Sequence, residues 1–279
     1  MNNTKNPYNT KNPYNTNNPY NTNNPYNTNN PYNTNNTNNP YNTNSNLNFY
    51  TNYSMNTNIN MNPNINFNTN LINNIKGLHE IHITVDPKQV YKFKVYCFKN
   101  KYKCIYPVSD IGDNPNQLML CKWKNGTSIN AIEKAFEIKN NLINNNIKVV
   151  RLKVEAMMHN VGVPKLNNSL CLDYNYFEYH LKMIINDYKL LEKFELFMKS
   201  MLSKPEGVKS GYSFNSFGDN IKILITLRIN GNFGSDKAES IKDNFITYMD
   251  NYNISFEGEI QKEFSVYDDN IEYDNNWLI

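Results

Sequence analysis

Apolar and polar side chains alternate in several short segments of the chain, and the first of these segments is 78–85. Three apolar residues and three polar residues take alternate positions there: Ile81, Ile83 and Val85, with Glu80, His82 and Thr84 between them. Such alternation is typical of a strand with one buried face. Asp86 and Pro87 follow as a helix N-cap and first helical residue, and Gln89 stands where a capping box would place it. The segment therefore predicts a strand followed by a helix.

The remaining patterns complete two sets of elements in the same order. In the first set, strands at 102–106 and 117–123, a helix at 128–142 and a strand at 147–156 follow the opening strand and helix. In the second set, a strand at 176–185 and a helix at 187–201 precede strands near 212 and at 221–229, a helix at 235–249 and a strand at 254–266. Each set has the order β-α-β-β-α-β, which is that of a ferredoxin-like unit.

Two short similarities between the sets indicate an internal duplication. Glu80-Ile81-His82 and Glu178-Tyr179-His180 each lie on the opening strand, and Gly112-Asp113-Asn114 and Gly218-Asp219-Asn220 each lie between the second and third strands. We therefore predict an α+β fold in which duplicated ferredoxin-like units, at 71–160 and 161–279, form one bilobal domain. Each unit would have a four-stranded sheet with both helices on one face.

The first seventy residues have a different composition, dominated by Asn, Thr, Pro and Tyr. A six-residue repeat begins at Asn6 with Asn-Pro-Tyr-Asn-Thr-Lys and recurs with small changes as far as Asn44. Each repeat has Tyr as its one large side chain, so no apolar face can offset the entropy of ordering. We predict a disordered Asn-rich tail and linker at 1–70. Its regularly spaced tyrosines can support weak self-association. The alternative is that the repeat has no function and reflects a genome whose codons favour Asn, Ile, Lys and Tyr.

Charge and cysteine content exclude several classes of protein. The net charge is +3, and Lys and Arg are dispersed among Asp and Glu, which does not indicate a general nucleic-acid-binding protein. The longest apolar stretches are strand-sized, and the N-terminus shows no secretory signal. Four cysteines without Cys-x-x-Cys spacing are interpreted as free buried thiols. We expect a cytoplasmic protein that does not associate with membranes.

Candidate chemistry lies on the polar faces of the predicted sheets, because the helices cover only the apolar faces. If the two uncovered faces oppose each other, His82 and His180 lie in one cleft. Three cationic residues of these faces, Arg151, Lys153 and Arg228, would bind an anionic small molecule or nucleotide. The cleft would thus pair two imidazoles with a cationic lining.

The segment Ile81-His82-Ile83-Thr84-Val85 resembles the His-x-Thr or His-x-Ser motif of the two-histidine phosphoesterases, which are bilobal duplicated α+β proteins with one motif per lobe. His180 matches the second motif in part, because Lys182 stands where a hydroxyl residue is expected. The resemblance implies that one neutral histidine acts as general base while the other, protonated, acts as general acid. Thr84 and Lys182 would contact the phosphate.

In this reading Glu80 and Glu178 would orient the imidazoles, and no metal or cofactor is required. The activity would be a metal-independent phosphodiesterase acting on a nucleotide or an RNA-end phosphodiester.

A second interpretation, which we prefer at this point, is a non-catalytic binding or structural module with an unknown partner. The charged residues would then form ion pairs across the sheet, and the imidazoles would only donate and accept hydrogen bonds. A third interpretation is RNA binding by an open sheet, which requires Tyr102 and Tyr106 to face outward as stacking platforms.

Two further histidines are considered. His79 lies on the apolar side of its strand and is expected to be a hydrogen-bonded core or edge residue. His159 lies in the linker, where a three-histidine metal site with His82 and His180 is conceivable. We expect no such site.

The acidic C-terminal run comprises Asp268, Asp269, Glu272 and Asp274. It is expected to be a solvated tail rather than a cation site or a cap on the cationic cleft. Trp277 and Leu278 are expected to pin its end to the domain.

Overall fold

The computed structural model describes residues 69–167, 171–184, 188–200, 206–217 and 222–278. These residues belong to one compact unit that spans 57–279. The predicted tail and linker lie outside the described residues except for Thr69 and Asn70, which begin a helix that was not predicted. The predicted turn at 218–220 also lies outside the described residues.

The described strands form one antiparallel sheet in the order β2-β4-β1-β5-β9-β6-β8-β7-β3. Their bounds are Lys76–Val85 (β1), Lys103–Ile105 (β2), Pro107–Val108 (β3), Met119–Thr127 (β4), Val149–Met157 (β5), Tyr176–Ile184 (β6), Val208–Asn215 (β7), Lys222–Asn230 (β8) and Glu257–Asp268 (β9). The mixed α+β class with a large antiparallel sheet is therefore confirmed.

The sheet runs continuously through both predicted units. The order β2-β4-β1-β5 in one half and β9-β6-β8-β7 in the other is the strand order of a ferredoxin-like unit in each case. The last strands of the two halves, β5 and β9, pair with each other from Lys153 opposite Asp268 to Met157 opposite Glu263. Backbone hydrogen bonds thus join the halves edge to edge.

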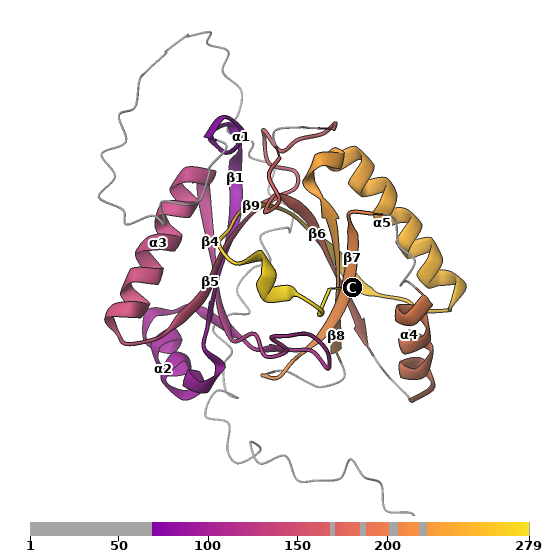
Figure 1. Ribbon diagram of the computed structural model, residues 1–279, viewed down its shortest axis with the longest axis horizontal. Coiled ribbons are helices and arrows are strands. Elements are labelled where there is room, and N and C mark those ends of the chain that lie inside the picture. Colours follow the sequence, from indigo (N-terminus) through magenta and orange to yellow (C-terminus); the bar gives the residue numbers. More distant parts are fainter. Residues whose placement is uncertain (1–68, 168–170, 185–187, 201–205, 218–221, 279) are drawn as a thin grey trace, which may run out of the picture. The chain divides into compact units, whose positions relative to one another are not determined.

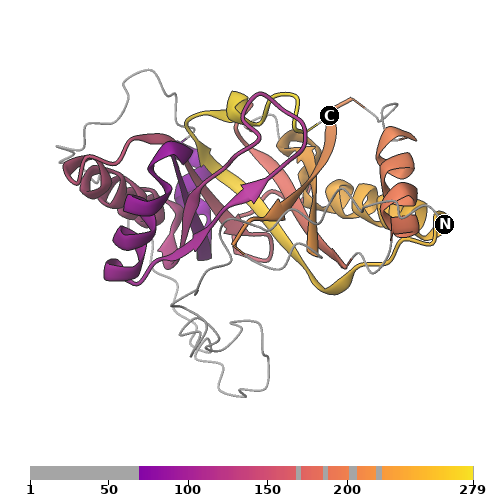
Figure 2. The same ribbon diagram turned by 90° about the horizontal axis from the view of Figure 1, so that it is seen from below.

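A short segment links the two outer edges of this sheet. β2 pairs with β4, and β3 pairs with β7, yet only Tyr106 separates β2 from β3. The backbone N–H of Tyr106 donates to Oδ1 of Asn215, and its carbonyl accepts from Ser216. The chain at Tyr106 therefore joins the two edges of the curved sheet (Figure 1, Figure 2). The sheet face that the helices leave uncovered is then the inner one. We did not predict β3, because a two-residue strand leaves no periodic pattern.

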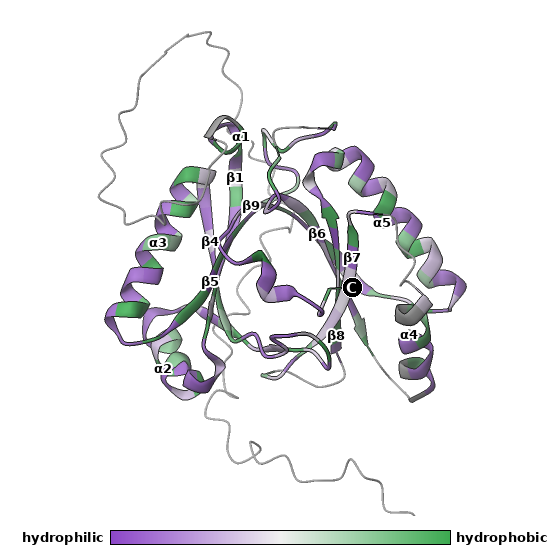
Figure 3. Cartoon of the chain, in the orientation of Figure 1, coloured by the Kyte–Doolittle hydropathy of each residue, from purple (hydrophilic) through white to green (hydrophobic). Residues whose placement is uncertain are grey.

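Helices cover the outer face of the curved sheet, with α2 and α3 outside one half and α4 and α5 outside the other (Figure 1). Their bounds are Thr69–Asn74 (α1), Val90–Asn100 (α2), Ser128–Asn144 (α3), Tyr188–Ser200 (α4) and Gly234–Asn251 (α5). Thr127 forms a capping box with Asn130 at the start of α3. Each long helix buries aromatic side chains against the sheet, among them Phe93, Phe136 and Phe245, while its outer surface is mainly hydrophilic (Figure 3).

None of the helices in the described segments is both long enough and apolar enough to cross a membrane.

The Asn160 side chain extends the sheet where β5 has ended, and we predict that it stabilises the fold. Its Oδ1 accepts from the Leu78 N–H at 3.1 Å, and its Nδ2 donates to the Leu78 carbonyl at 2.7 Å. Asn160→Ala should lower the free energy of unfolding by about 1–3 kcal/mol, because both groups of the Leu78 peptide lose their partner. Urea denaturation of the full chain measures this change. Asn145→Ala, at an exposed helix end, is the control, and an equal loss in both variants would contradict the assignment.

Candidate functional site: a histidine and glutamate cluster inside the sheet

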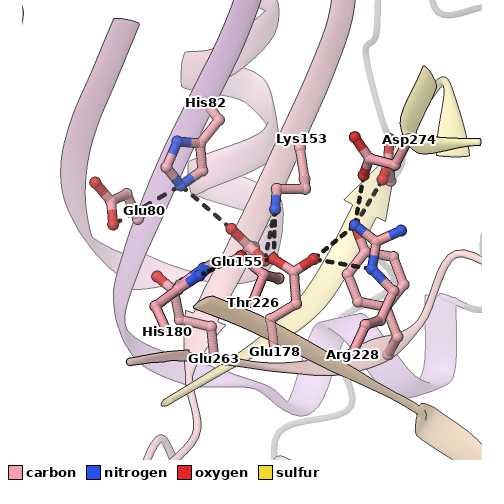
Figure 4. Close-up of polar contacts among 12 residues, drawn as sticks. Glu80, His82, Lys153, Glu155, Glu178, His180, Thr226, Arg228, Glu263 and Asp274 are labelled. Carbon is pink, nitrogen blue, oxygen red and sulfur yellow. Dashed lines mark hydrogen bonds and ion pairs between the residues drawn. The ribbon is translucent and has the colours of Figure 1, made fainter. Parts of the chain in front are cut away.

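His82 lies on β1 and points to the inside of the sheet (Figure 4). Its Nδ1 is 3.4 Å from Sγ of Cys121 on the neighbouring β4. Its Nε2 is 3.2 Å from Oε2 of Glu155 and 3.8 Å from Oε2 of Glu80. Burial lowers the pKa of His82, but Cys121, Glu80 and Glu155 raise it more, so it lies well above its ordinary value. The protonated imidazole is therefore favoured.

His180 on β6 has a matching environment in the other half of the sheet. Its Nδ1 is 3.1 Å from Oγ1 of Thr226 on the neighbouring β8. Its Nε2 is 3.3 Å from Oε2 of Glu263 and 3.5 Å from Oε2 of Glu178. Burial lowers the pKa of His180, but the neighbouring carboxylates raise it above the ordinary value. Both imidazoles thus turn Nδ1 toward a neutral side chain and Nε2 toward two carboxylates.

Two fully buried glutamates, Glu155 and Glu263, bring the histidines of the two halves together. Candidate ligand atoms of His82, Glu155 and Glu263 all lie within 4.8 Å of one another. Beyond the ion-pair contacts, neither oxygen of Glu155 nor Oε2 of Glu263 has a hydrogen bond of regular geometry within the described part of the chain. The sequence analysis did not single out this pair, although both residues are the charged members of alternating strands.

One cationic and one neutral side chain join these glutamates to the other half. Nζ of Lys153 is 3.0 Å from Oε1 of Glu155 and 2.8 Å from Oε2 of Glu178. In the opposite half, Nε2 of Gln261 donates to Oε2 of Glu80 at 2.7 Å and to Oε1 of Glu263 at 2.8 Å. The two equivalent bridging residues, Lys153 and Gln261, therefore differ by one positive charge.

The pKa values of Glu263 and Glu178, one glutamate from each bridged pair, follow this difference in charge. Burial raises the pKa of Glu263 to about 7, and the adjacent Glu155 contributes to the rise. Burial also acts on Glu178, but Lys153 and Arg228 hold its pKa well below its usual range. Negative charge is thus compensated around Glu178 and left in excess around Glu263.

The predicted anion-binding arginines already have carboxylate partners within the chain. Arg151 donates from Nε to Oδ1 of Asp268 and from Nη1 to Oδ1 of Asp274, both at 2.9 Å. Arg228 donates to Oδ2 of Asp274 and lies 4.0 Å from the centroid of the Tyr176 ring. The Tyr176 hydroxyl donates to Oδ2 of Asp268 at 2.7 Å. The expectation of a solvated acidic tail is therefore wrong, because these two aspartates are buried against the arginines.

Two other predicted residues, the expected phosphate contacts Thr84 and Lys182, make none of the contacts to the imidazole rings described above. Thr84 is buried two positions beyond His82, opposite Arg151 on β5. Lys182 is exposed and lies opposite Glu257.

The other histidines lie outside this cluster. His79 is buried, and its Nε2 lies 2.9 Å from Oγ of Ser128, as expected for a core histidine. His159 is exposed.

The aromatic residues considered for RNA stacking pack within the protein. Tyr102 stacks on Tyr96, and Tyr106 contacts the ring of Phe217 edge-on. Trp277 and Leu278 are buried, and Nε1 of Trp277 donates to the carbonyl of Tyr212, so these residues pin the C-terminal segment as expected.

Asp268 and Asp274 should control the stability of the protein in acid. Burial would raise the pKa of each, but Arg151, together with Arg228 for Asp274, lowers it below the ordinary value. A lowered pKa in the folded state contributes stability above the unfolded value of about 4 and loses it as pH falls further. The free energy of unfolding should therefore decrease as the pH is lowered below about 4.

Asp274→Asn tests this expectation by urea denaturation from pH 2 to 7. It should lower the free energy of unfolding at pH 7 by about 3–5 kcal/mol, because two buried arginines lose a partner, and it should flatten the acid limb. The exposed Asp250→Asn is the control. An acid limb as steep in Asp274→Asn as in the wild type would contradict this role.

No protein-family model matches the chain, and no curated protein matches it. Among solved structures, a putative monooxygenase from Lactobacillus acidophilus NCFM is similar at 12% identity, over 73% of this chain and 98% of that one, with a TM-score of 0.29. A chlorite dismutase from Candidatus Nitrospira defluvii in complex with imidazole is similar at 10% identity, over 68% of this chain and 91% of that one, with a TM-score of 0.25. Scores this low support no inference about activity or ligand.

Proposed function

We propose that the protein is a non-catalytic binding module whose ligand is a divalent transition-metal cation. The ligands would be Nε2 of His82 and of His180, with carboxylate oxygens of Glu155 and Glu263. The observation that carries the proposal is the pair of fully buried glutamates that face the two imidazoles, with three of their four carboxylate oxygens lacking a regular hydrogen bond among the described residues. Buried carboxylates without hydrogen bonds are costly unless a cation compensates them.

The spacing of these atoms supports a small four-coordinate cation. Ligand bonds of about 2.0–2.1 Å in a tetrahedral zinc site place neighbouring ligand atoms about 3.3–3.4 Å apart. The two Nε2–Oε2 distances, from His82 to Glu155 and from His180 to Glu263, are 3.2 and 3.3 Å. Candidate ligand atoms of His82, Glu155 and Glu263 lie within 4.8 Å of one another. His180 adjoins this set through Glu263, and its side chain would have to rotate toward the set to become the fourth ligand.

The charge inside the sheet also supports a cation. Six carboxylates there face three permanently charged cations: Glu80, Glu155, Glu178, Glu263, Asp268 and Asp274, with Arg151, Lys153 and Arg228. With both imidazoles neutral, as metal ligands must be, three negative charges are left over, and a bound divalent cation would reduce this excess to one. The cation would thus take the place of the two protons that the imidazoles otherwise hold.

The donor set selects the class of metal. Imidazole nitrogen together with carboxylate oxygen suits Zn²⁺, Fe²⁺ or Mn²⁺, whereas Ca²⁺ and Mg²⁺ prefer oxygen alone. Thr226 and Cys121 contact the Nδ1 atoms and would fix the orientation of the rings. Burial raises the pKa of the Cys121 thiol, so we assign Cys121 an orienting role rather than a ligating one.

The metal-independent phosphodiesterase has weaker support in this geometry. A general base must be neutral, and the carboxylates around each ring favour the imidazolium. The same carboxylates would repel a phosphodiester, and exposed Lys182 contributes no close contact to the rings. That activity stays a prediction.

We also infer that the two halves arose by duplication. Glu80 lies opposite Glu155 on the last strand of its half, and Glu178 lies opposite Glu263 on the last strand of the other. The central strands therefore supply one glutamate and one histidine each, and the last strands supply the second glutamate. A site at the junction would take equal sets of ligands from both copies.

Metal titration of the tag-free full chain tests the proposed function. Isothermal titration with Zn²⁺ and Mn²⁺, and with Fe²⁺ without oxygen, should show one bound cation per chain, and elemental analysis after dialysis should agree. His82→Ala and Glu263→Gln should weaken binding by at least about 100-fold, since each removes a ligand.

His159→Ala is the matched control, because it removes an exposed histidine outside the cluster. Absence of binding in the wild type, or an equal loss of affinity in the His159 variant, would refute the proposal.

A further inference from the structure

Lys153 and Gln261 take equivalent places in the two halves of the sheet. Lys153 lies on β5 directly opposite His82, and Gln261 lies on β9 directly opposite His180. Lys153 contacts Glu155 on its own strand and Glu178 in the other half. Gln261 likewise contacts Glu263 on its own strand and Glu80 in the other half. The nitrogen–oxygen distances are 2.8 and 3.0 Å for Lys153 and 2.7 and 2.8 Å for Gln261.

We infer that Lys153 is a tethered cation competing with the metal for the carboxylates, and that Gln261 marks the equivalent position where the chain has no such cation. This inference rests on the proposed function. It assigns to these two residues the control of metal affinity, although neither is a ligand.

The physical reason is the difference between an ammonium and an amide in the same geometry. Both donate hydrogen bonds to two carboxylates, but only the ammonium supplies a full positive charge. Lys153 bridges Glu155 and Glu178 and compensates part of their negative charge. Arg228 adds a second cation at Glu178. The pair bridged by Gln261 has no permanent cation within ion-pair distance among the described residues. The bound metal would supply the missing charge there.

Exchanging the two residues singly and together tests the inference. Gln261→Lys should weaken metal binding by at least about tenfold, because it places an ammonium beside the site. Lys153→Gln should strengthen binding by at least about tenfold, because it removes one. The double variant Lys153→Gln/Gln261→Lys should bind with nearly wild-type affinity, since one ammonium still contacts one of the two ligand glutamates. Isothermal titration with Zn²⁺ measures all four proteins.

A second measurement does not depend on the metal. In chelator-treated protein, Gln261→Lys should raise the melting temperature and Lys153→Gln should lower it, because the first supplies a counter-charge and the second removes one. Circular dichroism checks that each variant is folded.

The outcomes separate this inference from the proposed function. If the wild type binds Zn²⁺ and Gln261→Lys binds it equally tightly, the inference is overturned and the proposed function stands. If the wild type binds no metal, the proposed function is refuted, and so is the competition between Lys153 and the metal. A lower melting temperature for metal-free Gln261→Lys, with circular dichroism unchanged, would also overturn the counter-charge assignment.

Discussion

The closure of the sheet is the constraint on which the rest of the structure depends. An antiparallel sheet covered by helices on one face usually leaves the other face to water. Here the pairing of β5 with β9, and of β3 with β7, turns that face inward. Every charged side chain on it must then find a partner inside the protein, because an isolated buried charge is strongly unfavourable. The ion pairs, the histidine environments and the buried pair Glu155 and Glu263 all follow from this enclosure.

The C-terminal segment satisfies part of that requirement. Arg151 and Arg228 lie on strands of different halves, and Asp274 contacts both of them. Gln117 donates a third hydrogen bond to the same carboxylate, at 2.8 Å. The segment thus joins three parts of the chain through one buried carboxylate. Its acidic residues are a component of the folded interior rather than a tail.

Sequence alone predicted the local elements better than their assembly. Alternation at 78–85 and at 147–156 predicted β1 and β5, because each strand has one apolar and one charged face. The pairing of β5 with β9 has no sequence signature, since both strands could equally have formed free edges. The roles of Asp268 and Asp274 were missed for the same reason. Charge in a terminal run indicates solvation unless the structure places arginines beside it.

For the candidate site, the periodic pattern predicted the two histidines but not the two glutamates beside them. His82 and His180 were identified because each follows a glutamate on an opening strand. Glu155 and Glu263 became part of the site only when β5 and β9 were paired, which placed both carboxylates between the two imidazoles. An interior closed only for stability would be expected to match its charges or replace them with apolar groups, since buried ion pairs seldom add net stability. The charges around Asp268 and Asp274 are matched, whereas those around Glu263 are not. This local imbalance, within an otherwise paired interior, is the physical argument that the histidine and glutamate cluster is built to hold a cation.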